Sequence, residues 1–376
     1  DMGFIVSQIA GRYSQYNTVG SSFDPKIALL WQYDTWLSFR ASFAKAFAAP
    51  SVEQLYMPAE SGYSWFDPIG LDPFFPDNSN YQALNNLLGS GDLAPERGEI
   101  RNIGMSFSFF DDDLEMGLDF TDYRFTDRIT QQVPGRGQAA SNAISLDYAN
   151  FIAKYPNPTL EDKINWFQQD SDPNIIRDAD KSYIVTEIFY PLYNAGETNA
   201  TSLDFYLKAD IDFPKLFDAS IGSANIRLDI TKMLKYEYTS QSGSTVTAAE
   251  AIGTQNATQA FVPSMPEYQA VGSLLWNFRT NQDLLIRARW KDSIESSFQW
   301  GFMKESDVSD SGVLVDLSYR LILPQIGQLP GETEINIGAR NIFDKMPDVI
   351  GGLGGIDPFV SDPRGRMVFV GLKQSL

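Results

Sequence analysis

The chain has 376 residues, of which 13% are aromatic, and a formal net charge of −19; it contains neither cysteine nor histidine. Their absence excludes disulfide frameworks, the usual zinc, copper and haem sites and the common nucleophile and base pairings, and the acidic balance argues against nucleic acid as a partner. We therefore expect no catalytic residue, no metal ligand and no cofactor.

The start of the chain carries no recognisable targeting segment. It opens at Asp1 without a basic region or a small-residue cleavage site, so no signal peptide is predicted. No run of about 18 apolar residues occurs, so no transmembrane helix is expected either. We expect the chain to begin after processing or within a longer polypeptide.

A two-residue alternation of apolar and polar side chains recurs along the chain and predicts strands with one apolar and one polar face. The clearest examples, in chain order, are residues 37–43, 203–213, 284–290, 313–321 and 333–339. We count about a dozen such segments, each about as long as a membrane-crossing strand requires.

The predicted connections alternate in length. Short polar turns are expected at residues 32–34, 111–113 and 280–283, and long excursions at about 48–95, 131–181, 239–263 and 344–364. Short turns at one end and long loops at the other are typical of outer-membrane barrels. Within the second excursion, Thr159 is a candidate N-cap for a helix from residue 160 to about 169, with acidic residues in its first turn.

Two architectures fit this pattern, a soluble sandwich or propeller and a membrane barrel. The polar face carries charges that need water, among them Asp204, Lys208 and Arg287, whereas the apolar face needs a partner sheet or lipid. A closed barrel with lipid outside and a wet lumen satisfies both faces and the backbone. The sequence therefore favours an all-β, antiparallel transmembrane β-barrel, with residues 1–376 in one barrel domain.

Two sets of motifs strengthen the prediction of a barrel. Residues 338–347, GARNIFDKMP, followed by 362–373, DPRGRMVFVGLK, resemble the last two strands of TonB-dependent receptors. Residues 37–51, LSFRASFAKAFAAPS, and 93–96, LAPE, resemble a strand pair further upstream in that family, and 122–129 and 194–197 add further matches. The final residue, Leu376, departs from the aromatic with which the family usually ends.

The resemblance implies a particular fold. Family barrels have about 22 strands around a plug domain, so about twelve strands would form the C-terminal part of the barrel, with the plug domain absent from this chain. The alternative is a smaller barrel that is complete in itself.

The excursions contain the candidate ligand-binding residues. Aromatic side chains mixed with acids can stack on a sugar, a peptide or a siderophore ring, or they can simply pack the loop or sit in the interfacial girdle. These candidates are Tyr63, Trp65, Phe66, Phe74, Phe75 and Trp166. Residues 170–174, DSDPN, lack the glycine and the distal glutamate of a calcium loop, which favours a solvated acidic loop.

Arginines on the polar face form a second group of candidates. Arg287 and Arg289, with Arg227 and Arg279, would face the lumen. They would pair with plug carboxylates or guide an anionic ligand.

The function implied by the resemblance is that of a receptor, not an enzyme, in the bacterial outer membrane. It would bind a scarce nutrient, such as a siderophore, an oligosaccharide, cobalamin or a peptide, and import it with TonB-coupled energy. Its partners would be outer-membrane lipid, the plug domain and, through the missing N-terminal part, the TonB complex. The alternatives are a surface-displayed binding or adhesion barrel and an outer-membrane enzyme with an acid-pair mechanism.

Overall fold

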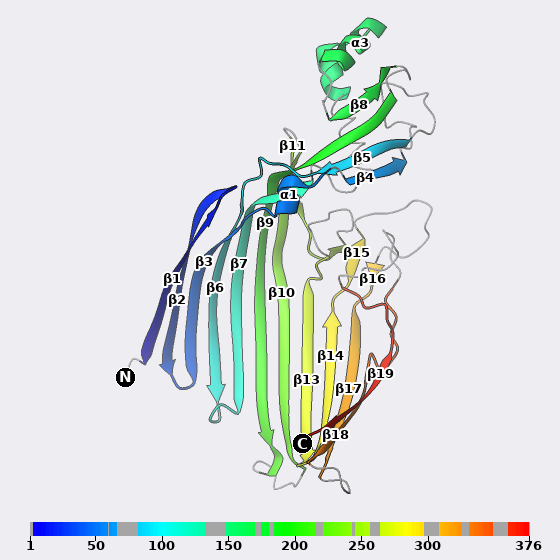
Figure 1. Cartoon of the computed structure of the whole chain (residues 1–376). Helices are drawn as coiled ribbons and strands as arrows, with labels where there is room; N and C mark the ends of the chain where they lie inside the picture. The colour runs from blue at the N-terminus through cyan, green and yellow to red at the C-terminus, as the bar shows by residue number, and fades with distance from the viewer. Residues whose placement is uncertain are drawn as a thin grey trace.

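The computed structural model describes residues 3–58, 60–65, 82–131, 148–169, 174–179, 184–214, 221–242, 245–255, 264–296, 308–324, 331–348 and 360–375. Twelve strands in these ranges form one curved antiparallel sheet, paired in the order of the chain (Figure 1). They are β1 (Phe4–Tyr16), β2 (Gly20–Asp34), β3 (Leu37–Ala48), β6 (Glu96–Phe109), β7 (Leu114–Gln131), β9 (Ile184–Asp212), β10 (Ser223–Ser242), β13 (Tyr268–Arg279), β14 (Gln282–Lys291), β17 (Gly312–Leu323), β18 (Thr333–Arg340) and β19 (Met367–Gln374). Within this sheet β1 and β19 pair on one side only, so the fold is a partial barrel, as predicted.

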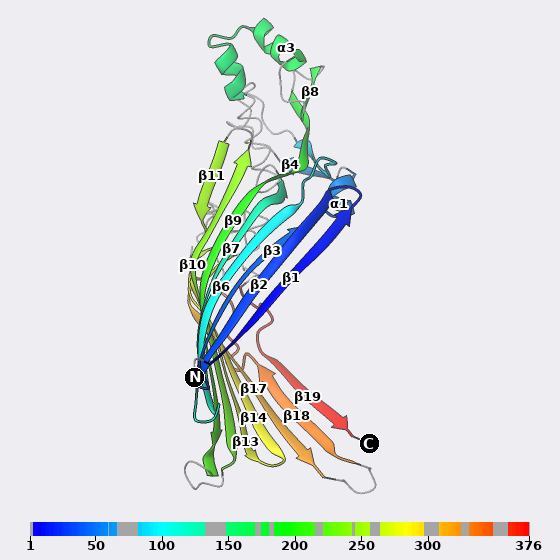
Figure 2. The ribbon, with the colours of Figure 1, turned by 90° about the vertical axis from the view of Figure 1, so that its left-hand side faces the viewer.

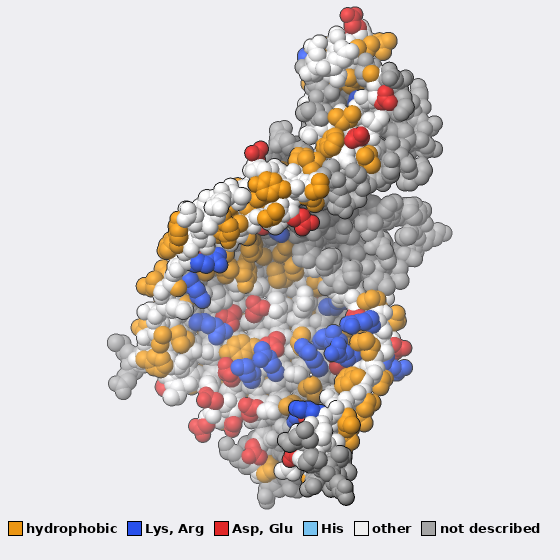
Figure 3. All heavy atoms as spheres, viewed as in Figure 1, with side chains coloured by type: hydrophobic (Ala, Val, Ile, Leu, Met, Phe, Trp, Pro, Cys, Tyr) orange, Lys and Arg blue, Asp and Glu red, His pale blue; other side chains and the backbone are white. Residues whose placement is uncertain are grey.

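The predicted alternation sets the two faces of the sheet. On β9, Phe205 lies opposite Leu118 of β7 and Ile230 of β10. Its neighbour Asp204 lies opposite Asp119 of β7. Because opposite residues of an antiparallel pair share a face, one face collects apolar side chains and the other collects polar ones. The sheet is curved (Figure 2), and its concave face carries the charged side chains (Figure 3).

The apolar, convex face is left open. Three of its side chains illustrate this: Ile9 is 81% exposed, Ile103 64% and Val370 73%. In a sandwich a partner sheet would bury these side chains, whereas in a membrane barrel hydrocarbon surrounds them. The exposed apolar face therefore agrees with the barrel and not with the sandwich.

The connections divide as predicted, with one exception and one addition. Tight turns lie at one end of the sheet, at residues 110–113 and 280–281 as predicted, and long excursions leave the other end (Figure 1). The turn predicted at 32–34 is wrong: these residues end β2, because its pairing with β3 continues to Asp34 and Leu37, and the turn follows at 35–36. The exception is the three-residue turn at 17–19, which joins β1 to β2 at the loop end. The addition is the excursion between β14 and β17, which the alternation did not single out.

The excursions carry small elements of their own. The first part of β9, a strand of 29 residues, extends beyond the sheet and pairs there with β8 (Ile175–Asp178) and β5 (Gln82–Leu88), which pairs with β4 (Glu60–Trp65) (Figure 1). The remaining elements are α1 (Val52–Tyr56), β11 (Thr245–Glu250), β12 (Thr254–Gln255), β15 (Ile294–Ser296) and β16 (Val308–Ser309). No helix in the described ranges has the length and hydropathy needed to span a membrane.

The predicted helix is present as α3 (Leu160–Gln169). The backbone N–H of Asp162 donates to Thr159 Oγ1 at 3.2 Å, and the Asp162 carboxylate accepts from the backbone N–H of Thr159 at 2.8 Å. This reciprocal pair is a capping box, so the N-cap inferred from the sequence is confirmed.

The motif around Asn194 of β9 joins the end of the first excursion to β7. Its side-chain amide donates to the carbonyl oxygens of Asp127 at 2.6 Å and Ala94 at 2.7 Å, and its Oδ1 accepts the Ala94 N–H at 2.7 Å. The Glu96 carboxylate accepts a further hydrogen bond from the backbone N–H of Ile129 at 2.9 Å. The segments that resemble the family therefore form a structural clasp at the base of the loops.

We expect Asn194→Ala to open this clasp, because three hydrogen bonds to backbone groups are lost at once. Hydrogen–deuterium exchange of the Ala94 amide should accelerate by about tenfold or more. The matched control is Asn199→Ala on the same strand, where the side-chain amide donates, among the described residues, to the Glu197 carboxylate alone, at 3.1 Å. Equal exchange in the two variants would contradict the clasp.

Candidate functional site

Charged side chains form a band across the concave face of the sheet (Figure 3). They are ion-paired within the wall: Arg40 with Asp119, Lys208 with Glu115, Arg227 with Asp229, Arg289 with Asp316 and Arg320 with Asp283. All but the Arg227 pair join different strands, so the cross-strand register sets which acid meets which base. Two of the predicted lumen arginines thus have partners in the wall itself, whereas Arg279 and Arg287 are exposed.

A cavity of about 570 Å³ lies at the loop end of this face, between β13, β14 and the connection from β18 to β19. Its polar lining consists of Ser264, Gln269, Arg289, Lys291, Ser309, Asp310, Lys345, Asp348, Ser361 and Asp362. Its apolar lining includes Met265, Pro266, Val271, Trp290, Leu314 and Met346. The volume and the mixed lining suit a small ligand that has both polar and apolar parts.

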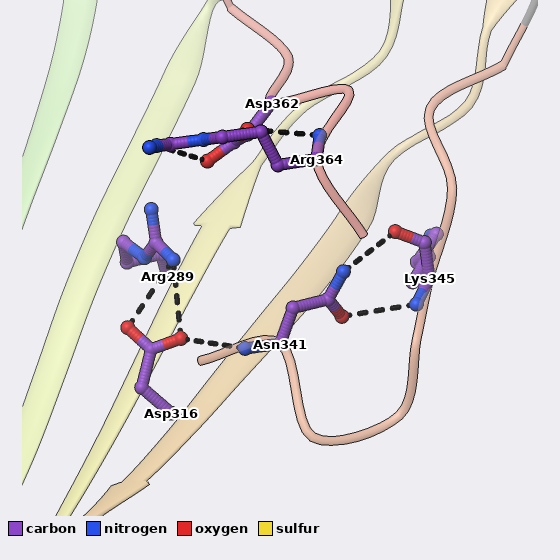
Figure 4. Close-up of polar contacts among 6 residues, drawn as sticks. All are labelled: Arg289, Asp316, Asn341, Lys345, Asp362 and Arg364. Carbon is purple, nitrogen blue, oxygen red and sulfur yellow. Dashed lines mark hydrogen bonds and ion pairs between the residues drawn. The ribbon is translucent and has the colours of Figure 1, made fainter. Parts of the chain in front are cut away.

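Arg289 lies in the cavity wall and contacts Asp316 of the neighbouring strand (Figure 4). Its Nη2 lies 3.1 and 3.2 Å from the two carboxylate oxygens of Asp316. The Asp316 Oδ1 also accepts the backbone N–H of Asn341 at 2.9 Å, so one carboxylate fixes both the arginine and the end of β18. Among the described residues the buried Arg289 Nε has no hydrogen-bond partner, although the side chain as a whole is 37% exposed.

Asn341 positions the lysine on the opposite wall. It takes a left-handed backbone conformation, with φ of 50°, and its side chain bonds the N–H and the carbonyl oxygen of Lys345 at 2.9 and 2.8 Å. Lys345 Nζ then lies over Gly312, where an added Cβ would sit only 2.8 Å from it. Glycine at position 312 therefore leaves room for the ammonium group at the cavity.

The start of β19 is fastened to the same connection. The Asp344 carboxylate accepts the backbone N–H of Arg366 at 2.7 Å. Gly365 has a φ of 64°, and an added Cβ would lie 3.0 Å from the Asp344 carboxylate. Residues 341–344 (NIFD) and 365–366 (GR), which belong to the two segments that resemble the family, therefore hold the start of β19 together, because the glycine lets the backbone approach the aspartate.

Asp362 and Arg364 form a two-bond pair above Arg289 in the view of Figure 4. The guanidinium Nε and Nη2 of Arg364 lie 2.8 and 2.7 Å from the two carboxylate oxygens, and the Arg364 N–H adds a bond at 3.1 Å. Hydrogen bonding to the Arg364 side chain, with a smaller electrostatic contribution from Arg289, lowers the pKa of Asp362 to about 2. The carboxylate is therefore charged at every pH at which the protein would function.

This pKa predicts an acid-dependent contribution to stability. The folded pKa of about 2 lies below the ordinary value of about 3.9, so the stabilisation is complete above about pH 4 and disappears as the pH falls through 2. Asp362→Asn lacks this contribution. The difference in unfolding midpoint between the native protein and this variant should therefore be constant from pH 7 to about pH 5 and shrink toward pH 2. A difference that does not change with pH would contradict the assignment.

The cavity brings three cations and three carboxylates together. The carboxylates of Asp348 and Asp362 are already engaged by neighbouring groups, the first by the N–H of Asp310 at 3.0 Å. Lys291 Nζ lies 3.2 Å from Ser309 Oγ at the rim. In the ranges that the structure describes, no group of three or more carboxylates is arranged to hold a metal ion. The arrangement can offer donors to an anionic group and apolar surface to the rest of a ligand.

The predicted site residues do not all meet here. Arg289 lines the cavity, and Arg287, two residues along the same strand, is exposed outside it. Trp166 is only 5% exposed and packs against Phe151, within the excursion between β7 and β9 that contains α3. Tyr63 and Trp65 lie in β4. Phe66, Phe74, Phe75 and the segment 170–173 lie outside the described residues.

Sequence reasoning did not select Lys291, Lys345, Asp348 and Asp362 as site residues. Only Lys291 carried a usable signal, since it has the same parity as Arg287 and Arg289 and ends the strand on the loop side. The other three come from the connection between β18 and β19, which folds back onto the wall. Nothing in the alternation predicts that return.

The comparisons with known proteins point to one family. A family model described as "TonB dependent receptor-like, beta-barrel" matches residues 7–342. No curated protein matches the chain.

Among solved structures, the ferric enterobactin receptor PfeA of Pseudomonas aeruginosa is similar with a TM-score of 0.62 and 17% identity, over 99% of this chain and 43% of that one. The siderophore receptor PirA of Acinetobacter baumannii gives 0.58 and 15%, over 99% and 43%. The chain thus spans less than half the length of these structures, and at such identities the likeness concerns the fold. The family match over most of the chain, the curved antiparallel sheet and the motif contacts together show that the chain belongs to the TonB-dependent receptor family, in its β-barrel domain.

Proposed function

We propose that the protein is an outer-membrane receptor that binds a small, anionic iron chelate at the loop end of its barrel and imports it with energy supplied through TonB. The observation that carries the proposal is the cavity on the water-facing side of the sheet, with Arg289, Lys291 and Lys345 in its wall. The names of the similar structures, receptors for ferric enterobactin and other siderophores, support this class of ligand.

The outer face supports a position in a membrane. Pairs of contacting aromatic rings lie on this face near the end of the sheet that carries the tight turns. Aromatic girdles of this kind mark the interfaces of membrane barrels. The pairs are Trp31 with Phe39 (5.5 Å between ring centroids), Trp36 with Phe107 (6.4 Å) and Trp276 with Phe278 (5.4 Å). Exposed apolar side chains such as Ile9 and Ile103 lie between this girdle and the loop end.

The proposal includes a larger assembly. β1 and β19 present unpaired edges in the described sheet, and such edges are costly in hydrocarbon. We propose that further strands of the intact receptor pair with these edges and that a plug domain fills the lumen. Exposed Arg279 and Arg287 would then be available to plug carboxylates.

Uptake by cells that carry the intact receptor as their only iron-chelate receptor tests the proposal. Radiolabelled ferric enterobactin should accumulate in cells grown under iron limitation, and deletion of the TonB gene should abolish accumulation while leaving binding at the cell surface. Surface binding without accumulation in cells with TonB would favour an adhesion or display barrel. Absence of both binding and accumulation, with the receptor folded in the membrane, would contradict this ligand class.

A further inference from the structure

Asp316 on β17 has two arginines of the neighbouring strand β14 within reach. Arg287 lies directly opposite it, whereas Arg289 lies opposite Leu314, one diagonal step away. Directly opposite residues have Cβ atoms about 4.5–5.5 Å apart, and diagonal neighbours about 7–8 Å. The carboxylate nevertheless bonds Arg289 (Figure 4). Arg287 is exposed, and no ion pair joins it to another described residue, so a second partner for the carboxylate stands ready.

The pair of Arg289 with Asp316 leaves much of the guanidinium unused. Both carboxylate oxygens contact the same nitrogen, Nη2, at 3.1 and 3.2 Å. In the same cavity Arg364 bonds Asp362 through two nitrogens, Nε and Nη2, at 2.8 and 2.7 Å, which is the stronger geometry. The buried Nε of Arg289 has no acceptor among the described residues. An anion in the cavity can therefore compete with Asp316 for this arginine.

The same carboxylate also holds the connection that follows β18. Asp316 Oδ1 accepts the backbone N–H of Asn341 at 2.9 Å. The next amide is bonded independently of any side chain, since the N–H of Ile342 donates to the carbonyl oxygen of Val315 at 2.8 Å. Departure of the carboxylate would free the first amide and leave the second bonded. The two amides therefore report where the Asp316 side chain is.

We propose, building on the uptake function proposed above, that Asp316 is a positioning residue that changes partner when the cavity fills. It neutralises Arg289 while the cavity is empty, and it turns to Arg287 when an anionic ligand takes Arg289. Neither state leaves the carboxylate or the cavity arginine without an opposite charge, and an uncompensated charge in the wall would be costly. The exchange needs the rotation of side chains only, because Arg287 is the nearer position in the register.

The exchange gives the filled cavity an effect beyond its own wall. It releases the Asn341 amide, and the Asn341 side chain holds Lys345 on the opposite wall. In the intact receptor it also sets Asp316 in competition with the plug carboxylate proposed for Arg287.

The exchange is tested first without a ligand, in the intact receptor. Arg289→Gln removes the first partner, so the carboxylate should turn to Arg287. The Asn341 amide should then exchange with deuterium about tenfold faster or more, while the Ile342 amide changes little. Addition of Arg287→Gln removes the second partner and should return the Asn341 amide toward its native rate. Hydrogen–deuterium exchange mass spectrometry, with fragmentation to single amides, gives the rates.

The matched control adds Arg279→Gln to Arg289→Gln instead. Arg279 is an exposed arginine on β13 outside the cavity, and its loss should leave the fast exchange of the Asn341 amide unchanged. Equal exchange in Arg289→Gln and in its double variant with Arg287→Gln would overturn the proposal. Restoration by the control as well would also overturn it, since loss of any arginine would then suffice. Heat-modifiable migration on gels checks that every variant is folded.

Ferric enterobactin is the probe for the ligand-driven step. Its binding to the native receptor should speed the exchange of the Asn341 amide, whereas a ligand that only shields the cavity would slow it. Arg287→Gln should lower the affinity about tenfold although it lies outside the cavity, because the displaced carboxylate then meets no cation. In the Asp316→Asn background the same substitution should change the affinity by less than about twofold.

The ligand arm separates this inference from the uptake proposal. Binding that leaves the Asn341 amide unchanged or slower, or an equal effect of Arg287→Gln in both backgrounds, would overturn the exchange. Absence of ferric enterobactin binding to the native receptor contradicts the uptake proposal instead, and the ligand-free rates then decide the exchange alone.

Discussion

Arg289→Glu is expected to lower the affinity of the intact receptor for ferric enterobactin by about tenfold or more, because it replaces one of the three cations of the cavity wall with an anion beside Asp316. The variant also leaves two carboxylates facing each other where an ion pair stood, which repels an anionic ligand further. Fluorescence quenching on titration gives the affinity, and radiolabelled uptake gives the transport rate.

The controls separate charge from structure. Arg289→Lys keeps the charge but loses the planar donor geometry, so its affinity should fall between those of the native protein and the glutamate variant. Arg227→Gln removes an arginine from the same concave wall outside the cavity, where it pairs with Asp229 at 2.7 Å, and should bind normally. If Arg227→Gln weakened binding as much as Arg289→Glu, the cavity would not be the ligand site.

Asp119→Ala is expected to destabilise the barrel by about 1–3 kcal/mol, which is below the cost of breaking a fully buried pair because water reaches one partner. The Asp119 side chain is 16% exposed and that of Arg40 is 38% exposed. Arg40 Nε donates to Asp119 Oδ1 at 2.6 Å, and Arg40 Cζ lies 5.9 Å from the centroid of the Tyr206 ring. Without the carboxylate, the guanidinium remains in the wall without an acidic ion-pair partner among the described residues. The free energy of unfolding in urea, measured in lipid vesicles, gives the effect.

Gly104 provides a second test of the same pair. An added Cβ there would overlap the Asp119 carboxylate and lie 2.8 Å from Arg40 Nε. Gly104→Ala should therefore destabilise the native protein, but it should cost much less in the Asp119→Ala background, since the group it displaces is gone. Additive effects of the two substitutions would mean that the pair is not what stabilises this part of the wall.

Much of the fold follows from local patterns in the sequence. The alternation between residues 203 and 213 predicted a strand and assigned its faces, because successive side chains of a strand point to opposite sides. The capping residues of α3 predicted its start for an equally local reason, since the groups that form the cap lie three residues apart. The motif at Asn341 identified the family, although the sequence could not state its physical role.

The sequence by itself determined which side chains lie on the apolar face of the sheet, which lie on the polar face, about how many strands there are and where the excursions leave the sheet. Only the tertiary structure decided which acid neutralises which base, since Arg40 and Asp119 are 79 positions apart and meet through the stagger of three strands. It also decided that Trp166 packs inside a loop and that Lys345 and Asp362 return to Arg289. The physical reason is that a two-residue period fixes the face of a side chain, whereas the register between strands and the path of a long connection depend on contacts between distant residues.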